Sequence, residues 1–377
     1  MSRARDLADL GNNAGGLETL TVSDITDITA TADEINLVDG SVSGPLSHRN
    51  MIINGAMQVA QRSASETGIG ATNGYFTVDR FNLDNGGLAG RLTMSQDNDS
   101  PNGFANSLKF ECTTADTSIG SGEYCILSTR LEGQDVQRFA KGTSDAKPFM
   151  VSFYVKGNAN ATYVCELYDG DNNRQISKTF SVTTSWTRVE LAFPADTTGT
   201  FDDDSNASLY LQIWLHGGSN YTSGTLNSGA WASNVSANRA VGITSFFDST
   251  DRTFFLTGVQ LELGSVATPF EHRSYADELQ RCQRYYETDE PEGGSDSRWS
   301  MYINTQFAHY FIIPFKATKR VIPTLTVNQT FNDNCTVSNA TGATSRSHAG
   351  FSAHNNNSNP NDARALSEFN WTADAEL

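Results

Sequence analysis

The stretch Leu209-Tyr210-Leu211-Gln212-Ile213-Trp214-Leu215 decides the fold class of this 377-residue chain. Aliphatic side chains occupy every second position, so they point to one face of an extended strand. The same period recurs at residues 149–155 and 187–193, and polar turns at 169–173 and 202–206 separate such segments. Short strands with turns between them and no helical pattern predict a mainly β protein, an antiparallel β-sandwich of the jelly-roll type.

This pattern divides the chain into four parts. Residues 49–272 carry the predicted sandwich, and residues 273–290 form a linker with one short helix. Residues 291–377 carry a smaller distal β-domain, in which alternation resumes at Trp299. Residues 1–48 contain too few apolar side chains to fold alone, so we expect this extended segment to pack against a partner or against copies of itself.

The linker helix is predicted from its start signal, because Ser274 can cap it with Asp277 at the third position. Its apolar side chains fall at 4-3-4 spacing, which resembles a short heptad stripe. One interpretation is a helix that packs on its own domain, and the other is a three-stranded bundle at the axis of a trimer. The stripe, and so the predicted trimer contact, consists of Tyr275, Leu279, Cys282 and Tyr286.

Composition excludes several classes of protein. The formal net charge is −17, so we expect repulsion from phosphate backbones and no nucleic-acid partner. No segment approaches the roughly 18 apolar residues of a membrane helix, so membrane insertion is not expected. The first residues are charged and lack an apolar core, so no signal peptide is predicted. Five cysteines occur without a CxxC pair, and we expect buried free thiols, although Cys112 and Cys125 could pair.

Three stretches resemble fibre proteins of tailed bacteriophages. Residues 2–10 look like the N-terminus of many tail-fibre chains, and residues 31–40 are similar to a unit of phage fibre shafts. The most specific stretch, residues 256–286 with the segment 50–57 and Gln61-Arg62, resembles the carbohydrate-binding-module-like domain in fibres of marine and cyanobacterial phages. Tyr75, Asp79-Arg80 and residues 371–377 also fit this resemblance.

The resemblance implies a homotrimeric tail fibre that binds envelope glycans of a host cell. Its N-terminus would attach to a phage tail or adaptor protein. Such a virion protein would be made in the host cytoplasm and reach the outside by lysis, which accounts for a missing signal and reduced cysteines. A head-decorating fibre or a structural spacer is the alternative. The residues implied in virion attachment are Arg3, Arg5, Asp6, Leu7 and Leu10.

No catalytic or metal motif stands out, so we expect no enzyme and no cofactor. The six histidines are scattered without HxH or HExxH spacing, which predicts no zinc site. Clustered carboxylates at Asp202, Asp203 and Asp204 could bind Ca²⁺, although a solvated turn is the simpler interpretation. A polysaccharide depolymerase stays an alternative, because 43 acidic residues could supply an acid–base pair that the sequence does not single out.

Glycan binding needs aromatic faces beside hydrogen-bonding groups. In the body, Trp214, Tyr210, Gln212 and His216 share the strand face opposite the aliphatic side chains, which either binds glycan or covers a second core or trimer interface. Tyr221 and Trp231 lie in nearby polar loops. In the distal domain we expect recognition on a loop at the tip. The predicted glycan-binding residues are Trp214, Tyr210, His216, Tyr221, Trp231, His348, Phe351 and His354.

Overall fold

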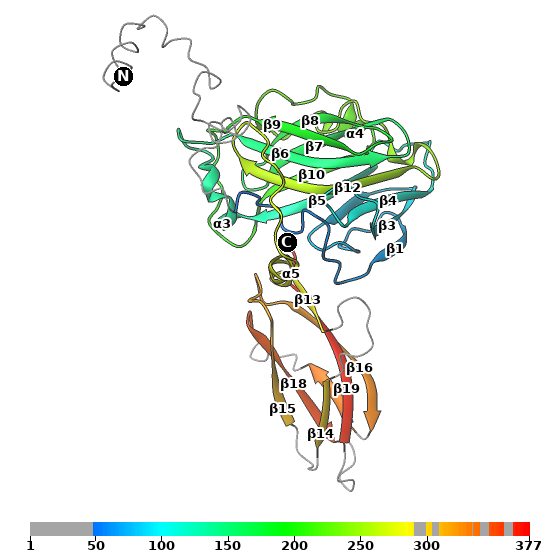
Figure 1. Cartoon of the computed structure of the whole chain (residues 1–377), viewed down its shortest axis with the longest axis vertical. Helices are drawn as coiled ribbons and strands as arrows, with labels where there is room; N and C mark the ends of the chain where they lie inside the picture. Colours follow the sequence, from blue (N-terminus) through cyan, green and yellow to red (C-terminus); the bar gives the residue numbers. More distant parts are fainter. Residues whose placement is uncertain (1–47, 290–298, 304–308, 334, 340–346, 358–364) are drawn as a thin grey trace, which may run out of the picture.

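The structure is a computed structural model, and it describes residues 48–289, 299–303, 309–333, 335–339, 347–357 and 365–377. The predicted virion-attachment residues therefore lie outside the described part of the chain. Every strand pair within it is antiparallel. The strands form a large sandwich above a smaller pair of sheets (Figure 1).

The body is a sandwich of two six-stranded sheets, so the predicted mainly β, jelly-roll-like architecture is confirmed. The first sheet has the order β1-β3-β4-β12-β6-β9. The long strand β12 closes the body in sequence but lies in the middle of this sheet, between β4 and β6. The strand bounds are Ser65–Ile69 (β1), Arg91–Asp97 (β3), Ser107–Thr114 (β4), Thr253–Leu263 (β12), Phe149–Gly157 (β6) and Thr187–Phe193 (β9).

The second sheet has the order β11-β8-β7-β10-β5-β2, with β10 between β7 and β5. Asp169 pairs with Arg174 at the turn from β7 to β8, so the predicted turn at residues 169–173 is confirmed and joins the two strands of a hairpin. The bounds are Ala232–Ser233 (β11), Arg174–Val182 (β8), Ala161–Asp169 (β7), Ala207–Gly217 (β10), Tyr124–Glu132 (β5) and Asn82–Gly86 (β2).

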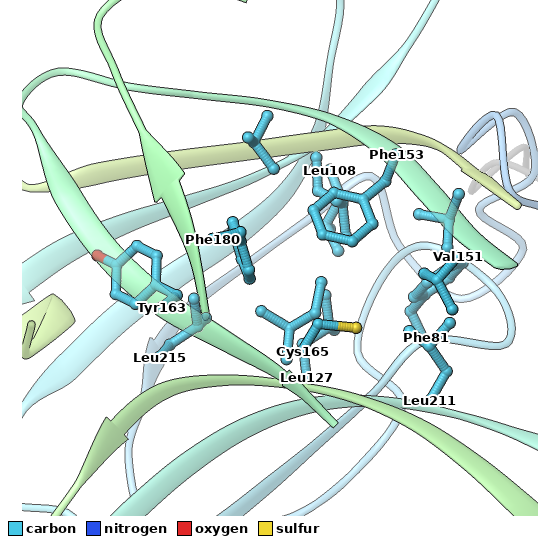
Figure 2. Close-up of a cluster of buried hydrophobic side chains, with 14 of the residues drawn as sticks. Phe81, Leu108, Leu127, Val151, Phe153, Tyr163, Cys165, Phe180, Leu211 and Leu215 are labelled. Carbon is cyan, nitrogen blue, oxygen red and sulfur yellow. The ribbon is translucent and has the colours of Figure 1, made fainter. Parts of the chain in front are cut away.

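The hydrophobic core lies between the two sheets, where the alternating side chains interdigitate (Figure 2). Phe153 of β6 contacts Phe180 of β8 edge-on at a ring-centroid distance of 5.0 Å. Leu211 and Leu215 of β10 face the same core and are almost fully buried. Cys112, Cys125, Cys165 and Cys282 are buried free thiols, as predicted for these four cysteines. The sandwich therefore closes through the packing of side chains rather than through cross-links among these residues.

Short helical turns sit in the loops of the body. A 3-10 turn beside the second sheet brings Phe139 onto Phe149, with a centroid distance of 3.9 Å. The helix α4 follows β10 directly and carries Tyr221. The bounds are Gly133–Val136 (α3), Gln137–Phe139 (η3), Ser219–Thr222 (α4), Ser236–Asn238 (η4) and Phe246–Asp248 (η5).

The linker helix α5 (Tyr275–Gln283) packs on its own chain. The Ser274 hydroxyl accepts a hydrogen bond from the Asp277 amide at 3.2 Å, so the predicted cap is confirmed. Cys282 is fully buried, and Tyr286 is buried in strand β13 beyond the helix end. These two residues cannot contribute to an intermolecular stripe, so that part of the trimer-contact prediction is wrong. Tyr275 is exposed and Leu279 is half-buried.

The distal part holds two small sheets around a cluster in which Phe315, Phe351 and Trp371 are in mutual ring contact. In one sheet β19 pairs with β13, β14 and β16, and in the other β18 lies between β15 and β17. The bounds are Tyr286–Thr288 (β13), Trp299–Ile303 (β14), His309–Pro314 (β15), Thr324–Asp333 (β16), Cys335–Asn339 (β17), Gly350–Asn357 (β18) and Ala365–Asp374 (β19).

The last residues of the chain return to the body, so the C-terminus lies at the junction (Figure 1). Arg80 is 1 % exposed, forms an ion pair with Glu376 and lies 3.4 Å from the centre of the Tyr285 ring. The backbone oxygen of Leu377 accepts hydrogen bonds from Arg130 and from the Tyr75 hydroxyl. The distal part is therefore tied to the body by the tail as well as by the linker.

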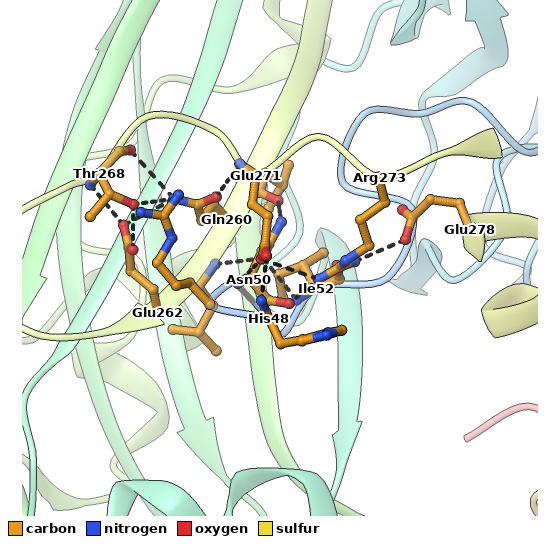
Figure 3. Close-up of polar contacts among 12 residues, drawn as sticks. His48, Asn50, Ile52, Gln260, Glu262, Thr268, Glu271, Arg273 and Glu278 are labelled. Carbon is orange, nitrogen blue, oxygen red and sulfur yellow. Dashed lines mark hydrogen bonds and ion pairs between the residues drawn. The ribbon is translucent and has the colours of Figure 1, made fainter. Parts of the chain in front are cut away.

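A network of buried polar side chains joins the segment 48–52 to β12 and to residues 268–278 (Figure 3). The Asn50 amide group donates to the Val259 carbonyl at 3.0 Å and accepts from the Ile52 amide at 2.9 Å. The Glu271 carboxylate accepts a hydrogen bond from the backbone amide of Asn50, and the backbone amide of Glu271 donates to the Gln260 side-chain oxygen. We call Asn50, Gln260, Glu262, Thr268 and Glu271 the closure network. It uses residues of the phage-fibre resemblance to lock the sandwich rather than to form a surface site.

Candidate functional site

The outer face of β10 forms the floor of a pocket. Three of its side chains, Tyr210, Gln212 and Trp214, lie side by side with their partners on the neighbouring strands β7 and β5. Tyr210 lies between Tyr168 of β7 and Arg130 of β5, and Gln212 is opposite Glu166 of β7. Trp214 lies between Val164 and Ile126. The resulting pocket has a volume of about 280 Å³. We call it the aromatic pocket; it is lined by Asp84, Tyr124, Ile126, Tyr168, Tyr210, Gln212, Trp214, Tyr221 and Arg239.

Aromatic rings build two walls of the aromatic pocket. On one side, Tyr221 lies 5.2 Å from Trp214 and 5.3 Å from Tyr124, measured between ring centroids. On the other side, Tyr168 meets Tyr210 edge-on at 5.5 Å. The four tyrosines are only partly buried, whereas Trp214 is fully buried. Burial raises the pKa of the Tyr124 and Tyr168 phenols, so both carry neutral hydroxyl groups at neutral pH.

A buried ion pair holds the base of the pocket. Both Glu166 carboxylate oxygens accept hydrogen bonds from Arg239, with the shortest at 2.8 Å, and Trp214 donates its indole N–H to Glu166 at 2.7 Å. Arg239 also donates to the Gln212 side-chain oxygen at 2.9 Å. Its guanidinium lies 4.9 Å from the Trp214 ring centre. This arrangement fixes the tryptophan in one orientation and places a positive charge beside it.

A second arginine closes the opposite edge. Arg130 donates to both oxygens of Asp84, at 3.0 and 3.2 Å, and lies 5.4 Å from the Tyr210 ring centre. Both of these charged side chains are about one-fifth exposed. The pocket therefore combines partly open aromatic faces with preorganised amide, guanidinium and phenol groups, which is the chemistry that recognises a polyhydroxylated ligand.

The structure brings together three of the predicted body residues and separates the other two. Tyr210, Trp214 and Tyr221 all line the aromatic pocket. Trp231 instead packs in the main core against Phe149 at 5.5 Å and is 7 % exposed, so the prediction that it stacks on a ligand is wrong. Its indole N–H donates to the Pro194 carbonyl at 2.9 Å, and its ring belongs to the main hydrophobic core.

His216, which was also predicted to bind glycan, does not line the aromatic pocket. Its side chain is fully buried, with Nδ1 2.8 Å from the Ser245 hydroxyl and the ring edge against Phe247. The register shifts between Trp214 and His216, and this irregularity turns His216 away from the aromatic face. The opposite face of β10 thus covers a small second core of Ile126, Val164, Trp214 and Ala240, with a pocket above it. The interpretation that this face covers a second core is confirmed, and glycan binding there stays a prediction.

The distal predictions require a correction. The expected loop containing His354 is the strand β18, and Phe351 is 2 % exposed within the distal core. His348 is exposed, but its carbonyl accepts a hydrogen bond from the Lys319 amide at 2.8 Å. The Lys319 ammonium in turn contacts Glu287 of β13, next to the body. His348 therefore lies at the end of the distal part that faces the body, not at its tip.

Several residues of the aromatic pocket were not predicted from sequence. Tyr168 and Glu166 alternate with core residues in β7, so the same period-2 reasoning could have placed them beside β10. Arg239 and Asp84 carried no such signal. Arg239 lies in the loop after η4, and only the tertiary structure brings it over Trp214.

The predicted calcium position is a surface turn. Asp202 and Asp203 are exposed, and the Asp204 carboxylate accepts a hydrogen bond from the Asn206 amide at 2.8 Å. These contacts explain the acidic run as a local turn, and calcium binding there stays a prediction. Within the part of the chain that the structure describes, no helix has the length and apolar character needed to cross a membrane.

Comparisons with known proteins identify similar structures but no family. No family model matches the chain, and no curated protein matches it. A family 30 carbohydrate-binding module aligns with 61% of this chain and 94% of its own, at 11% identity and a TM-score of 0.30. The module TmCBM61, solved with β-1,4-galactotriose, aligns with 57% of this chain and 99% of its own, at 10% identity and a TM-score of 0.29.

A phage protein is also similar in structure. The enzymatically active domain of bacteriophage CBA120 tailspike protein 4 aligns at 12% identity and a TM-score of 0.30. The alignment covers 57% of this chain but only 21% of the tailspike chain. At these values the similarity carries no argument about function, and the chemistry of the site rests on the geometry of the aromatic pocket.

Proposed function

We propose that this chain is a glycan-binding subunit of a phage fibre and that the aromatic pocket holds the glycan. The observation that carries this proposal is the pocket itself, where partly exposed tyrosines and the edge of a locked tryptophan surround hydrogen-bonding groups. Sugar rings present apolar C–H faces and hydroxyl edges, which match aromatic faces and polar side chains respectively.

The volume of the pocket limits how much of a glycan it could hold. Its volume of about 280 Å³ is near the lower limit of small-molecule pockets, roughly 300–1,000 Å³. A terminal residue or a short side branch fits this volume better than a long buried chain. Affinity at one such site would be modest, and several copies in a fibre would raise the effective concentration after the first contact.

The phage-fibre assignment rests on the sequence resemblance, with a homotrimer as the proposed assembly. The N-terminal segment 1–48 would attach the trimer to the virion. Light scattering coupled to size-exclusion chromatography tests the assembly, because a trimer would have a mass near three times 40.9 kDa. A monomer at micromolar concentration would contradict the fibre assembly and leave a single-copy binding module.

The pocket supports binding better than hydrolysis. A glycosidase needs one carboxyl group to donate a proton and another to act as base or nucleophile. The two carboxylates of this region are Asp84 and Glu166, and both oxygens of each accept hydrogen bonds from an arginine. This engagement occupies the oxygens that would have to face the scissile bond. If purified protein shortened host polysaccharide and Asp84→Asn stopped it, the binding-only proposal would be wrong.

The decisive experiment is binding to an array of bacterial lipopolysaccharide and capsule oligosaccharides. Tyr210→Ala and Tyr221→Ala remove one ring from each wall, and both tyrosines are partly exposed. We expect each change to weaken binding at least 10-fold, about 1.4 kcal/mol, because a stacking face is lost. The melting temperature should change little.

Trp186→Ala is the matched control. Trp186 is a partly buried aromatic residue in the turn before β9, where its ring contacts Phe255 of the first sheet and its indole N–H donates to Asp99 at 3.0 Å. We expect this variant to bind the array as the wild type does. Equal losses in all three variants, or undiminished binding by both tyrosine variants, would place the glycan site elsewhere.

A further inference from the structure

A second cluster lies at one end of β10, outside the aromatic pocket. Asp116, Glu123 and His216 each offer one ligand atom, and these atoms all lie within 4.8 Å of one another. His216 Nε2 is 3.7 Å from the nearer Glu123 carboxylate oxygen. The three residues come from the loop between β4 and β5 and from the end of β10, so their spacing in sequence resembles no metal motif.

Two of these ligand atoms are buried without a hydrogen-bond partner in the described part of the chain. These atoms are His216 Nε2 and Asp116 Oδ2. His216 is 0 % exposed and Asp116 is 7 % exposed. A buried polar atom without a partner costs roughly 1–3 kcal/mol. Two such atoms beside a third potential ligand indicate a shared group that satisfies all three.

The surroundings of His216 suit a metal ligand. The Ser245 hydroxyl lies 2.8 Å from His216 Nδ1 and is itself held by the Phe247 amide at 3.0 Å. When Nδ1 donates to Ser245, the lone pair of Nε2 points toward the carboxylates. Metal-bound histidines commonly use their other nitrogen in this way. The Glu123 carboxylate accepts from the Gly120 amide at 2.9 Å, and the Asp116 carboxylate accepts from the Ser118 amide at 3.1 Å.

A proton shared between the carboxyl groups is the competing explanation. Burial, with the neighbouring Asp116 carboxyl, raises the pKa of Glu123. A shared proton would satisfy two oxygens but would leave His216 Nε2 without a partner. A cation satisfies all three atoms. Tetrahedral ligands at about 2.0–2.2 Å from Zn²⁺ lie roughly 3.3–3.6 Å from one another, close to the observed 3.7 Å between His216 Nε2 and the Glu123 carboxylate.

We propose that Asp116, Glu123 and His216 bind one divalent transition-metal ion of the Zn²⁺ class. An imidazole nitrogen favours Zn²⁺ over Ca²⁺ and Mg²⁺, which take oxygen ligands. Glu123 keeps 13% of its side chain exposed, which provides a route for the ion and a position for water as the fourth ligand.

The proposed ion would stabilise a loop that supports the aromatic pocket. The Gly218 amide donates to the Glu123 carbonyl at 2.8 Å, and the Asn220 amide donates to the Ser121 carbonyl at 3.0 Å. An added Cβ at Gly218 would lie 2.0 Å from the Gly120 oxygen, so the two loops are in direct contact. Tyr221 follows at once in α4. The link from metal to glycan rests on the proposed function, whereas metal binding itself does not.

The test uses full-length protein freed of metal by chelation and titrated with Zn²⁺ by calorimetry. We expect one ion per chain and a melting temperature that rises with Zn²⁺ concentration, because the ion binds the folded state. Asp116→Asn and His216→Gln should each weaken Zn²⁺ binding at least 10-fold. His272→Gln, at an exposed histidine, is the control and should bind as the wild type does.

The outcomes separate the possibilities. Less than 0.2 ions per chain, or unchanged affinity in both ligand variants, would overturn the metal site. Equal affinity for Ca²⁺ would overturn the role of the histidine. Far-ultraviolet circular dichroism of each variant verifies folding, and Asp116→Asn keeps the proposal testable if His216→Gln fails to fold. Loss of Zn²⁺ binding with unchanged glycan binding would overturn only the link to the pocket.

Discussion

The closure network lies beside β12 of the first sheet, and the aromatic pocket lies on β10 of the second sheet. Both contain clustered polar side chains, but these side chains face different surroundings. In the closure network, Asn50, Glu262 and Glu271 bind backbone groups or other members of the network and are mostly buried. In the pocket, Glu166 and Arg239 bind each other below a set of partly exposed aromatic rings. One cluster completes the fold, and the other leaves an accessible surface.

This difference shows that the residues that resemble phage fibres are not the residues that line the proposed glycan pocket. Residues 50–57 and 256–273 are part of the stretches that carry the phage-fibre resemblance, and the structure uses them to close the sandwich. The residues of the aromatic pocket carry no such resemblance apart from their strand periodicity. A family likeness based on closure residues therefore predicts the fold more firmly than it predicts the ligand.

The largest expected effect is on the closure network. Asn50→Ala removes the partner of the Val259 carbonyl and of the Ile52 and Leu261 amides. Leaving these buried groups without a partner should lower the free energy of unfolding by about 3–5 kcal/mol. Urea denaturation measures this loss. A loss below about 1 kcal/mol would show that the network does not hold the sandwich closed.

A smaller loss is expected within the pocket, where one ion pair is structural. Arg239→Met leaves the buried Glu166 carboxylate without its arginine and should destabilise by about 3 kcal/mol. Adding Glu166→Gln should restore at least half of that loss, because the unpaired charge is removed. If the double variant were no more stable than Arg239→Met alone, Arg239 would contribute by packing rather than by charge.

A buried carboxyl at the junction gives the third prediction. Burial raises the pKa of Asp79 from 3.8 to about 6, against the opposing effect of Arg62. Between these pH values the folded chain holds a proton that the unfolded chain has released, so this group destabilises the fold as pH rises. From pH 7.5 to 5.0, the wild type should gain about 1.4 kcal/mol relative to Asp79→Asn.

The measurement for Asp79 is the difference in unfolding free energy between the two proteins at each pH. Other carboxylates titrate in both proteins and cancel in this difference. A wild type that lost stability relative to Asp79→Asn on acidification would contradict the raised pKa.

The smallest expected effect provides a baseline for the others. Lys109 and Glu111 form an ion pair of 2.7 Å in which the side chains are 24% and 41% exposed. Lys109→Ala should change the free energy of unfolding by less than about 0.5 kcal/mol, because solvent screens such pairs. A larger change would mean that surface pairs contribute to this sandwich and that the effects above must be corrected for them.

Sequence reasoning predicted the strands better than the positions of side chains in loops. The inward faces of β6 and β10 follow from a period of two, and the Ser274 cap follows from local chemistry. Trp231 and Phe351 were misplaced because an aromatic residue in a polar segment can point either way, and only tertiary packing decides. The Asn-rich β18 lacks apolar alternation but pairs on both sides.

The return of the tail to the body has a mechanical consequence. Two neighbouring strands, β13 and β19, connect the distal sheets to the body, and Arg62 of the body contacts both, at 3.7 Å from the Tyr286 ring centre and at 3.3 Å from the Asp374 carboxylate. A single connecting strand would let the lower part swivel about its bonds. A paired neck with arginine anchors on both strands resists torsion, so a sideways pull on the distal sheets is transmitted to the sandwich as a whole.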